Sequence, residues 1–169
     1  MRTRSRTLLL ILSLGFTGVT ADGGDGPERK RPPVGFIGVF RPVFTGAGMD
    51  PERCPDPSHP LLFTFTGEAY TTLGRARFEQ SHCEAVDHTS FRRGLQTITF
   101  ENGEKLFGTY RGELLSTPTS HLDHRLVIDG IYRNRGGTGS LNDARGSGIS
   151  AGVVDTSTGG AEVTVSGTL

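Results

Sequence analysis

The sequence predicts an all-β protein, a closed antiparallel β-barrel of about eight strands. Apolar and polar residues alternate with a period of two over several runs, as in half-buried strands. No window of about 11 residues or more has helical periodicity. Glycines recur on the apolar parity of the predicted strands, which favours a barrel over a flat sandwich. The chain of 169 residues suits one domain.

Residues 1–21 have the pattern of a secretory signal peptide. Arg2, Arg4 and Arg6 precede an apolar run over residues 8–16. That run is too short for a bilayer core of about 30 Å, and residues 19–21 form a small-x-small cleavage site. We therefore expect a cleaved, exported protein, secreted or periplasmic, with no transmembrane segment after cleavage. An uncleaved membrane anchor is the alternative.

The expected domain boundaries follow from composition. Residues 22–33 are polar and rich in glycine and proline, which predicts a flexible, disordered tail. Residues 34–169 form a single β-barrel domain, with the barrel core at about 61–169. Residues 34–44 are rich in Val, Ile and Phe but contain Pro42, so we expect an edge strand there, since proline is tolerated at sheet edges.

The charge balance argues against a nucleic-acid partner. The chain has 18 Lys+Arg and 18 Asp+Glu, and residues 1–21 hold three arginines and no acidic residue. The cleaved chain would carry 15 minus 18, a net charge of −3. Nucleic-acid binding depends on basic surfaces that neutralise phosphates, so no such partner is expected.

Cys54 and Cys83 are the two cysteines of the chain. In an oxidising compartment an even count favours a disulfide between them, and two buried thiols are the alternative. A cysteine-based metal site is not expected, because the sequence has no CxxC pair.

The clearest strand signals lie after residue 60. Asn102 and Gly103 predict a type I′ turn, in which both central residues have positive φ, joining residues 97–101 to 104–114 as a hairpin. A last hairpin is expected to turn over residues 156–160. The remaining alternating runs are residues 61–70, 73–83, 92–100, 125–133, 149–155 and 161–169.

Glycines within the predicted strands support the barrel. A glycine inside a strand costs about 0.5–1 kcal/mol relative to alanine, so several of them need a structural reason. Sharp bending or a tapered barrel interior supplies that reason, and a flat sandwich does not. The glycines on the predicted inward face are Gly67, Gly108, Gly112, Gly130 and Gly167.

One glycine-rich segment resembles a known family element. Its residues are Gly136, Gly137, Gly139, Leu141, Ala144 and Gly146. With Asn102-Gly103 and the segments 106–112 and 128–130, it is similar to the eight-stranded barrel superfamily of allene oxide cyclases and dirigent proteins, in particular its short exported bacterial members of unknown function.

The resemblance covers about residues 54–169 and implies a fold, not an activity. The cysteines flanking residues 71–74 also match the bacterial pattern, although Thr72 stands where those relatives often have histidine. No position matches the catalytic residues of the plant cyclases or the dirigent motifs. The glycine segment is expected to be the tight connection that determines the fold, with Leu141 and Ala144 plugging the bend.

The ionisable residues do not point to one specific chemistry. The groups His121/Asp123/His124 and His82/Glu84/Asp87/His88 each invite a metal interpretation, but surface or loop positions explain these histidines more simply. No metal and no cofactor is therefore expected. Glu68 and Glu113 fall on the outward face; with the faces inverted they would lie in the lumen, where desolvation raises a carboxyl pKa.

The aromatic residues of the inward face are the candidates for lining a ligand: Phe63, Phe65, Tyr110 and Tyr132. The favoured hypothesis is an exported, non-enzymatic barrel that is structural or holds a small apolar ligand. An isomerase or cyclase acting on an apolar substrate in the lumen is the second; it requires a buried ionisable residue there. The third is a self-assembling, homo-oligomeric surface protein with Phe107 and Ile98 exposed.

Overall fold

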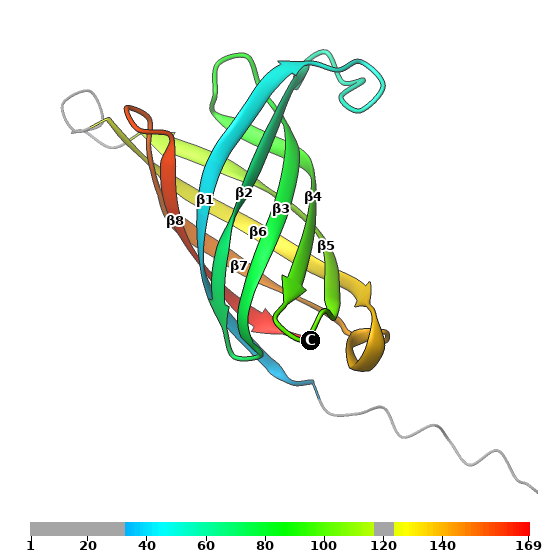
Figure 1. The fold of residues 1–169 in the computed structure, drawn as a ribbon. Helices are drawn as coiled ribbons and strands as arrows, with labels where there is room; N and C mark the ends of the chain where they lie inside the picture. The colour runs from blue at the N-terminus through cyan, green and yellow to red at the C-terminus, as the bar shows by residue number, and fades with distance from the viewer. Residues whose placement is uncertain (1–32, 117–123) are drawn as a thin grey trace, which may run out of the picture. The chain divides into compact units, whose positions relative to one another are not determined.

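The computed structural model describes residues 33–116 and 124–169, and these form a closed barrel of antiparallel strands in sequence order (Figure 1). The predicted signal peptide, nearly all of the predicted tail, and His121 lie outside the described residues. The strands are β1 (Gly35–Met49), β2 (Leu61–Thr71), β3 (Gly74–Glu84), β4 (Ser90–Phe100), β5 (Lys105–Ser116), β6 (Arg125–Gly137), β7 (Arg145–Asp155) and β8 (Gly160–Thr168). This architecture confirms the predicted fold class.

The up-and-down order gives the barrel two distinct ends. The connections β1–β2, β3–β4 and β7–β8 gather at the end drawn uppermost in Figure 1, called the upper end here. The connections β2–β3, β4–β5 and β6–β7 lie at the opposite, lower end, together with Gly35 and the C-terminal Leu169. Among the described residues, no helix is long and apolar enough to cross a membrane.

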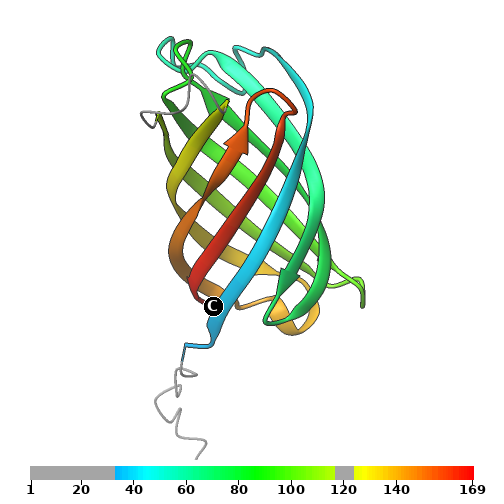
Figure 2. The same ribbon diagram turned by 90° about the vertical axis from the view of Figure 1, so that its left-hand side faces the viewer.

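The expectation of an edge strand at residues 34–44 is wrong. β1 pairs with β2 on one side and with β8 on the other, and Figure 2 shows β1 and β8 side by side. The β1–β8 register passes from Phe40–Val163 directly to Val43–Gly160, so Pro42 falls where the ladder is interrupted. The barrel therefore begins at Gly35 and not near residue 61.

The hairpin at Asn102-Gly103 exists, but its turn is not type I′. Positive φ in the loop belongs to Gly103 alone, at 83°. The Gly103 N–H donates to the Phe100 carbonyl (2.9 Å), and the Phe100 N–H donates to the Glu104 carbonyl (2.9 Å). This pattern is a three-residue loop that ends in a left-handed residue, the second common way to match the twist of a hairpin.

The glycine-rich segment is a connection whose two ends belong to strands. β6 continues to Gly137 and β7 begins at Arg145, so the connection is only residues 138–144, including the 3₁₀ turn η1 (Gly139–Leu141). A Cβ on Gly137 would overlap the Lys105 carbonyl oxygen, which explains why glycine is needed there. Leu141 and Ala144 pack against the core, as expected.

The lower half of the barrel is filled by side chains. The core residues share the inward parity of their strands: Phe36, Phe40, Ala69, Ala76, Phe78, Ile98, Phe100, Leu106, Tyr132 and Val165. The five glycines predicted to face inward do so; a Cβ on Gly167, for example, would lie 2.6 Å from Tyr132 Oη. These glycines therefore make room for large side chains.

Charged residues lie on the outer surface, and two of them were predicted to do so. Glu68 faces outward, where its carboxylate accepts a hydrogen bond from Arg75 (2.8 Å), and Glu113 is also exposed, as predicted. Phe107 is 39% exposed, but the expectation that Ile98 is exposed is wrong, because Ile98 has the inward parity of β4 and is fully buried.

Candidate functional site

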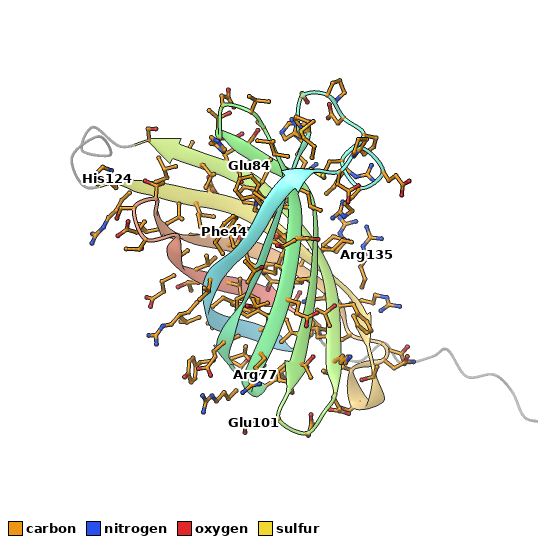
Figure 3. All side chains as sticks on the ribbon, turned by 45° about the horizontal axis from the view of Figure 1, so that its top comes forward. Phe44, Arg77, Glu84, Glu101, His124 and Arg135 are labelled. Carbon is orange, nitrogen blue, oxygen red and sulfur yellow. A yellow bond between two sulfur atoms is a disulfide. The ribbon has the colours of Figure 1, made fainter. Side chains whose placement is uncertain are left out.

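The upper half of the barrel holds a cavity of about 430 Å³. Phe40, Tyr132 and Val165 belong both to the core and to the cavity lining, so the floor of the cavity is the top of the packed lower half. In Figure 3, Phe44 and Glu84 lie toward the upper end, and Arg77 and Glu101 toward the lower end.

Side chains of different size border the cavity. β1, β2 and β4 contribute the aromatic lining residues Phe40, Phe44, Phe63, Phe65 and Phe91. The inward positions of β6, β7 and β8 include the small residues Gly130, Ser150, Gly152 and Ala161 among larger apolar ones. These small residues leave space in the lumen that the phenyl rings do not fill.

The four residues predicted to line a ligand site all border this cavity. Phe63 and Phe65 come from β2 and lie 6.4 Å apart between ring centroids. Tyr110 from β5 and Tyr132 from β6 are register partners. The two phenyl rings and the two phenols thus border the lumen from different strands.

One wall of the cavity carries a lumen polar cluster, formed by His82, Glu84, His88 and Tyr110. His82 Nε2 lies 3.0 Å from Glu84 Oε2, and His88 Nδ1 lies 2.6 Å from Glu84 Oε1. His82 Nδ1 lies 3.1 Å from Tyr110 Oη. A continuous chain of hydrogen bonds therefore runs from Tyr110 in the lumen to His88, whose side chain is half exposed at the upper end.

The carboxyl of Glu84 is ionised although its side chain is only 6% exposed. Desolvation alone raises a buried carboxyl pKa, but the hydrogen bonds from His82 and His88 outweigh it and hold the pKa of Glu84 below its ordinary value. A carboxylate only accepts hydrogen bonds. Both histidines therefore donate to it, His82 through Nε2 and His88 through Nδ1.

Tyr110 is held neutral by its surroundings. Desolvation in the barrel interior raises the pKa of its phenol, the charge of Glu84 adds to this, and Arg53 opposes it. Arg53 reaches this region from the β1–β2 connection and donates to the Arg93 carbonyl, at a bulge in β4. Burial and the charge of Arg93 lower the pKa of the Arg53 guanidinium.

Aromatic rings surround the imidazole of His82. Phe91 stacks on it at 4.8 Å between centroids, Phe65 lies at 5.2 Å, and the Tyr110 ring meets it edge-on at 5.7 Å. This packing holds the ring in one orientation. The imidazole of His82 is therefore enclosed by rings on the lumen side, whereas the side chain of His88 is half exposed.

The local sequence explains how β3 and its turn build the cluster. His82 and Glu84 share the inward parity of Ala76 and Phe78 on β3. His88 has a left-handed backbone, with φ of 56°, and its N–H donates to the Ala85 carbonyl (3.0 Å). This tight turn brings the His88 ring back over Glu84.

Sequence reasoning missed this cluster. It assigned His82 and His88 to loop or surface positions, whereas His82 lies within β3 and points into the lumen. The alternation of inward and outward residues along β3 could have placed His82 inside the barrel. The alternation was hard to recognise because the polar Gln80 also faces inward. Gln80 donates from Nε2 to Gln96 Oε1 (3.1 Å), so these two amides bind each other on the lumen wall.

The upper rim is tied together beside the cluster. Cys54 and Cys83 form the expected disulfide, which links the β1–β2 connection to β3. His59 is also buried in this rim, where Nε2 lies 2.9 Å from Ser90 Oγ and Nδ1 lies 2.7 Å from Ser58 Oγ. These links hold the β1–β2 connection against β3 and β4.

The described residues contain no group of three His, Cys, Asp or Glu side chains placed to hold a metal ion. The donor atoms of His82, Glu84 and His88 are engaged with one another. Of the second histidine group suggested by the sequence, only His124 is described, and its carbonyl accepts hydrogen bonds from Thr156. No family model, curated protein or solved structure matches this chain.

Proposed function

We propose that this barrel binds one small, mostly apolar molecule in the cavity of its upper half. The observation that carries the proposal is an apolar cavity of about 430 Å³ with a few convergent polar groups on one wall. Small-molecule sites in proteins are typically concave, largely apolar and about 300–1,000 Å³ in volume. On this proposal the protein is an exported carrier or sensor without catalytic activity.

Binding is tested with N-phenyl-1-naphthylamine, an apolar probe whose fluorescence rises in apolar surroundings. We expect the wild type to bind it with saturation. Ala161→Trp, which fills the cavity from β8, is expected to abolish binding. Ala151→Trp is the matched control, because Ala151 is exposed on the outer face of the adjacent β7. Saturable binding that survives Ala161→Trp would place the probe elsewhere and contradict the proposal.

A second candidate is an isomerase or cyclase acting on an apolar substrate. The observation in its favour is the ionisable cluster in the lumen, since His82 and Glu84 are buried and Tyr110 lines the cavity. In such a site catalysis would combine orientation and water exclusion with proton transfer by a positioned side chain. This candidate requires turnover of an apolar epoxide, measured by chiral chromatography. The turnover must be lost in His82→Phe.

Self-assembly is a third candidate, on residues that differ in part from those first expected. Phe107 is partly exposed, and Ile131 (47% exposed) pairs in register with Ile149 (59% exposed) on the outer face of β6 and β7. Size-exclusion chromatography with light scattering tests it. A monomer at high protein concentration would remove this candidate and leave the ligand proposal intact.

A further inference from the structure

The directions of the hydrogen bonds in the lumen polar cluster define what Tyr110 offers a ligand. Glu84 is a carboxylate and accepts from His82 Nε2, so the proton of a neutral His82 ring is on Nε2. The other nitrogen, Nδ1, is then an acceptor. Its partner at 3.1 Å is Tyr110 Oη, which must donate its single proton to it.

Glu84 is the acidic group in contact with His82, and it has a second hydrogen-bond partner at 2.6 Å in His88, whose ring is half exposed. The other groups that face this region are Tyr110 and Arg53, and Arg53 already places a positive charge near the phenol. A positive charge on the buried His82 ring would lose its hydration and repel Arg53, so the geometry favours the neutral ring.

We infer that the cavity selects an apolar ligand that carries a hydroxyl group, an alcohol or a phenol, bound through Tyr110 Oη. With its proton committed to His82, the Tyr110 oxygen has only lone pairs left for a ligand. A ligand hydroxyl donates to them, whereas a carbonyl oxygen and the Tyr110 oxygen would both be acceptors, with no hydrogen between them. This inference rests on the proposed binding function and specifies the class of ligand.

The rest of the cavity lining is mostly apolar, and its polar side chains outside the lumen polar cluster are Gln80, Gln96, Tyr132, Ser150 and Thr156. The aromatic lining excludes water from the ligand skeleton, and Gln80 and Gln96 bind each other. A ligand whose apolar skeleton fits the cavity and whose hydroxyl donates to Tyr110 therefore buries no unpaired hydrogen-bond donor. An unpaired buried donor is costly, which is why one hydroxyl contributes to selectivity.

The test uses three molecules with one skeleton: 1,3-diphenylpropan-2-ol, 1,3-diphenylpropan-2-one and 1,3-diphenylpropane. Each competes with N-phenyl-1-naphthylamine for the wild type at neutral pH. We expect the alcohol to bind about tenfold more tightly than the ketone, as one satisfied buried hydrogen bond provides. The affinity of the hydrocarbon measures the contribution of the apolar cavity alone.

Tyr110→Phe removes the anchor and keeps the ring. This variant is expected to bind the hydrocarbon as the wild type does and to lose the preference for the alcohol. Tyr70→Phe is the matched control, because Tyr70 lies on the outer surface, where its hydroxyl donates to Glu68, and it should keep the preference.

Equal or tighter binding of the ketone at neutral pH, or a preference that survives in Tyr110→Phe, would overturn the inference. Failure of all three molecules to bind would instead overturn the proposed function.

Discussion

The two halves of the barrel are built from the same strands but differ in how their interiors are filled. In the lower half Phe36, Ile98 and Leu106 are fully buried and pack together with the other core residues. In the upper half the same inward parity leads to a cavity of about 430 Å³. A hollow barrel therefore depends on which residue sizes face each other, and not on the alternation itself.

The two halves also differ in the kind of groups that they bury. The lower half buries mainly hydrocarbon and leaves Tyr132 Oη and Asn134 Oδ1 without a hydrogen-bond partner among the described side chains. The upper half buries Glu84 and His82 and pairs both. Apolar packing is thus concentrated at the lower end, and the buried ionisable groups Glu84 and His82 lie at the upper end.

Leu106→Ala and Leu114→Ala give the largest expected contrast. Both leucines are on β5 with the same parity, but Leu106 is fully buried in the core and Leu114 borders the cavity. Leu106→Ala should lower the free energy of unfolding by about 3–4 kcal/mol, since a new void forms in a packed site. Leu114→Ala should cost clearly less. Urea unfolding measures both, and equal losses would mean that the upper half is as tightly packed as the lower.

Removal of the disulfide should have the next largest effect. The double variant Cys54→Ala/Cys83→Ala releases a covalent link between positions 29 residues apart. We expect a loss of about 3 kcal/mol from the greater freedom of the unfolded chain. Thermal unfolding with and without a reducing agent measures it: the reductant should destabilise the wild type and leave the variant unaffected.

Glu84→Gln tests the charge in the upper half. Losing the charge-assisted hydrogen bonds from two histidines should cost about 2 kcal/mol at neutral pH. Because the folded pKa of Glu84 is lowered, its stabilisation is present above the ordinary glutamate pKa of about 4.3 and is lost as pH falls through the folded value. The stability gap between wild type and variant should therefore shrink on acidification.

The same urea series at several pH values measures this gap. Exposed carboxyls whose pKa is also lowered are common to both proteins, so they cancel in the difference: Asp56, Glu68, Asp87, Glu104 and Asp155. A gap that widens in acid would show that Glu84 is protonated in the folded protein.

The smallest effect is expected at the lower end, in the turn between β4 and β5. Gly103 has φ of 83°, and a Cβ added there would meet open space, so Gly103→Ala isolates backbone strain and should cost about 1 kcal/mol. Gly48→Ala on β1 is the control, since its Cβ would also meet open space but its φ is not positive. Equal thermal stability of the two variants would contradict the strained turn.

The sequence predicted the closed barrel, the disulfide and the inward glycines because each depends on local rules of period, pairing and size. The four predicted lining residues border the cavity for the same reason. The lumen polar cluster was missed because it depends on a turn that returns His88 to Glu84 and on β5, which brings Tyr110 to His82. The contact of His82 with Tyr110 joins positions 28 residues apart, which leaves no mark on a local pattern. The sequence did not predict that β1 closes the barrel, because Pro42 indicated an edge strand.

The pairing of β1 with β8 has a consequence for the order of folding. Gly35 pairs with Thr168, so barrel closure joins the two ends of the described domain. The hairpins between consecutive strands close short loops, whereas this ladder closes almost the whole domain and must overcome the largest loop entropy. We expect closure to be the slow, late step of folding, so that a partly folded chain already has most of its hairpins while the cavity does not yet exist.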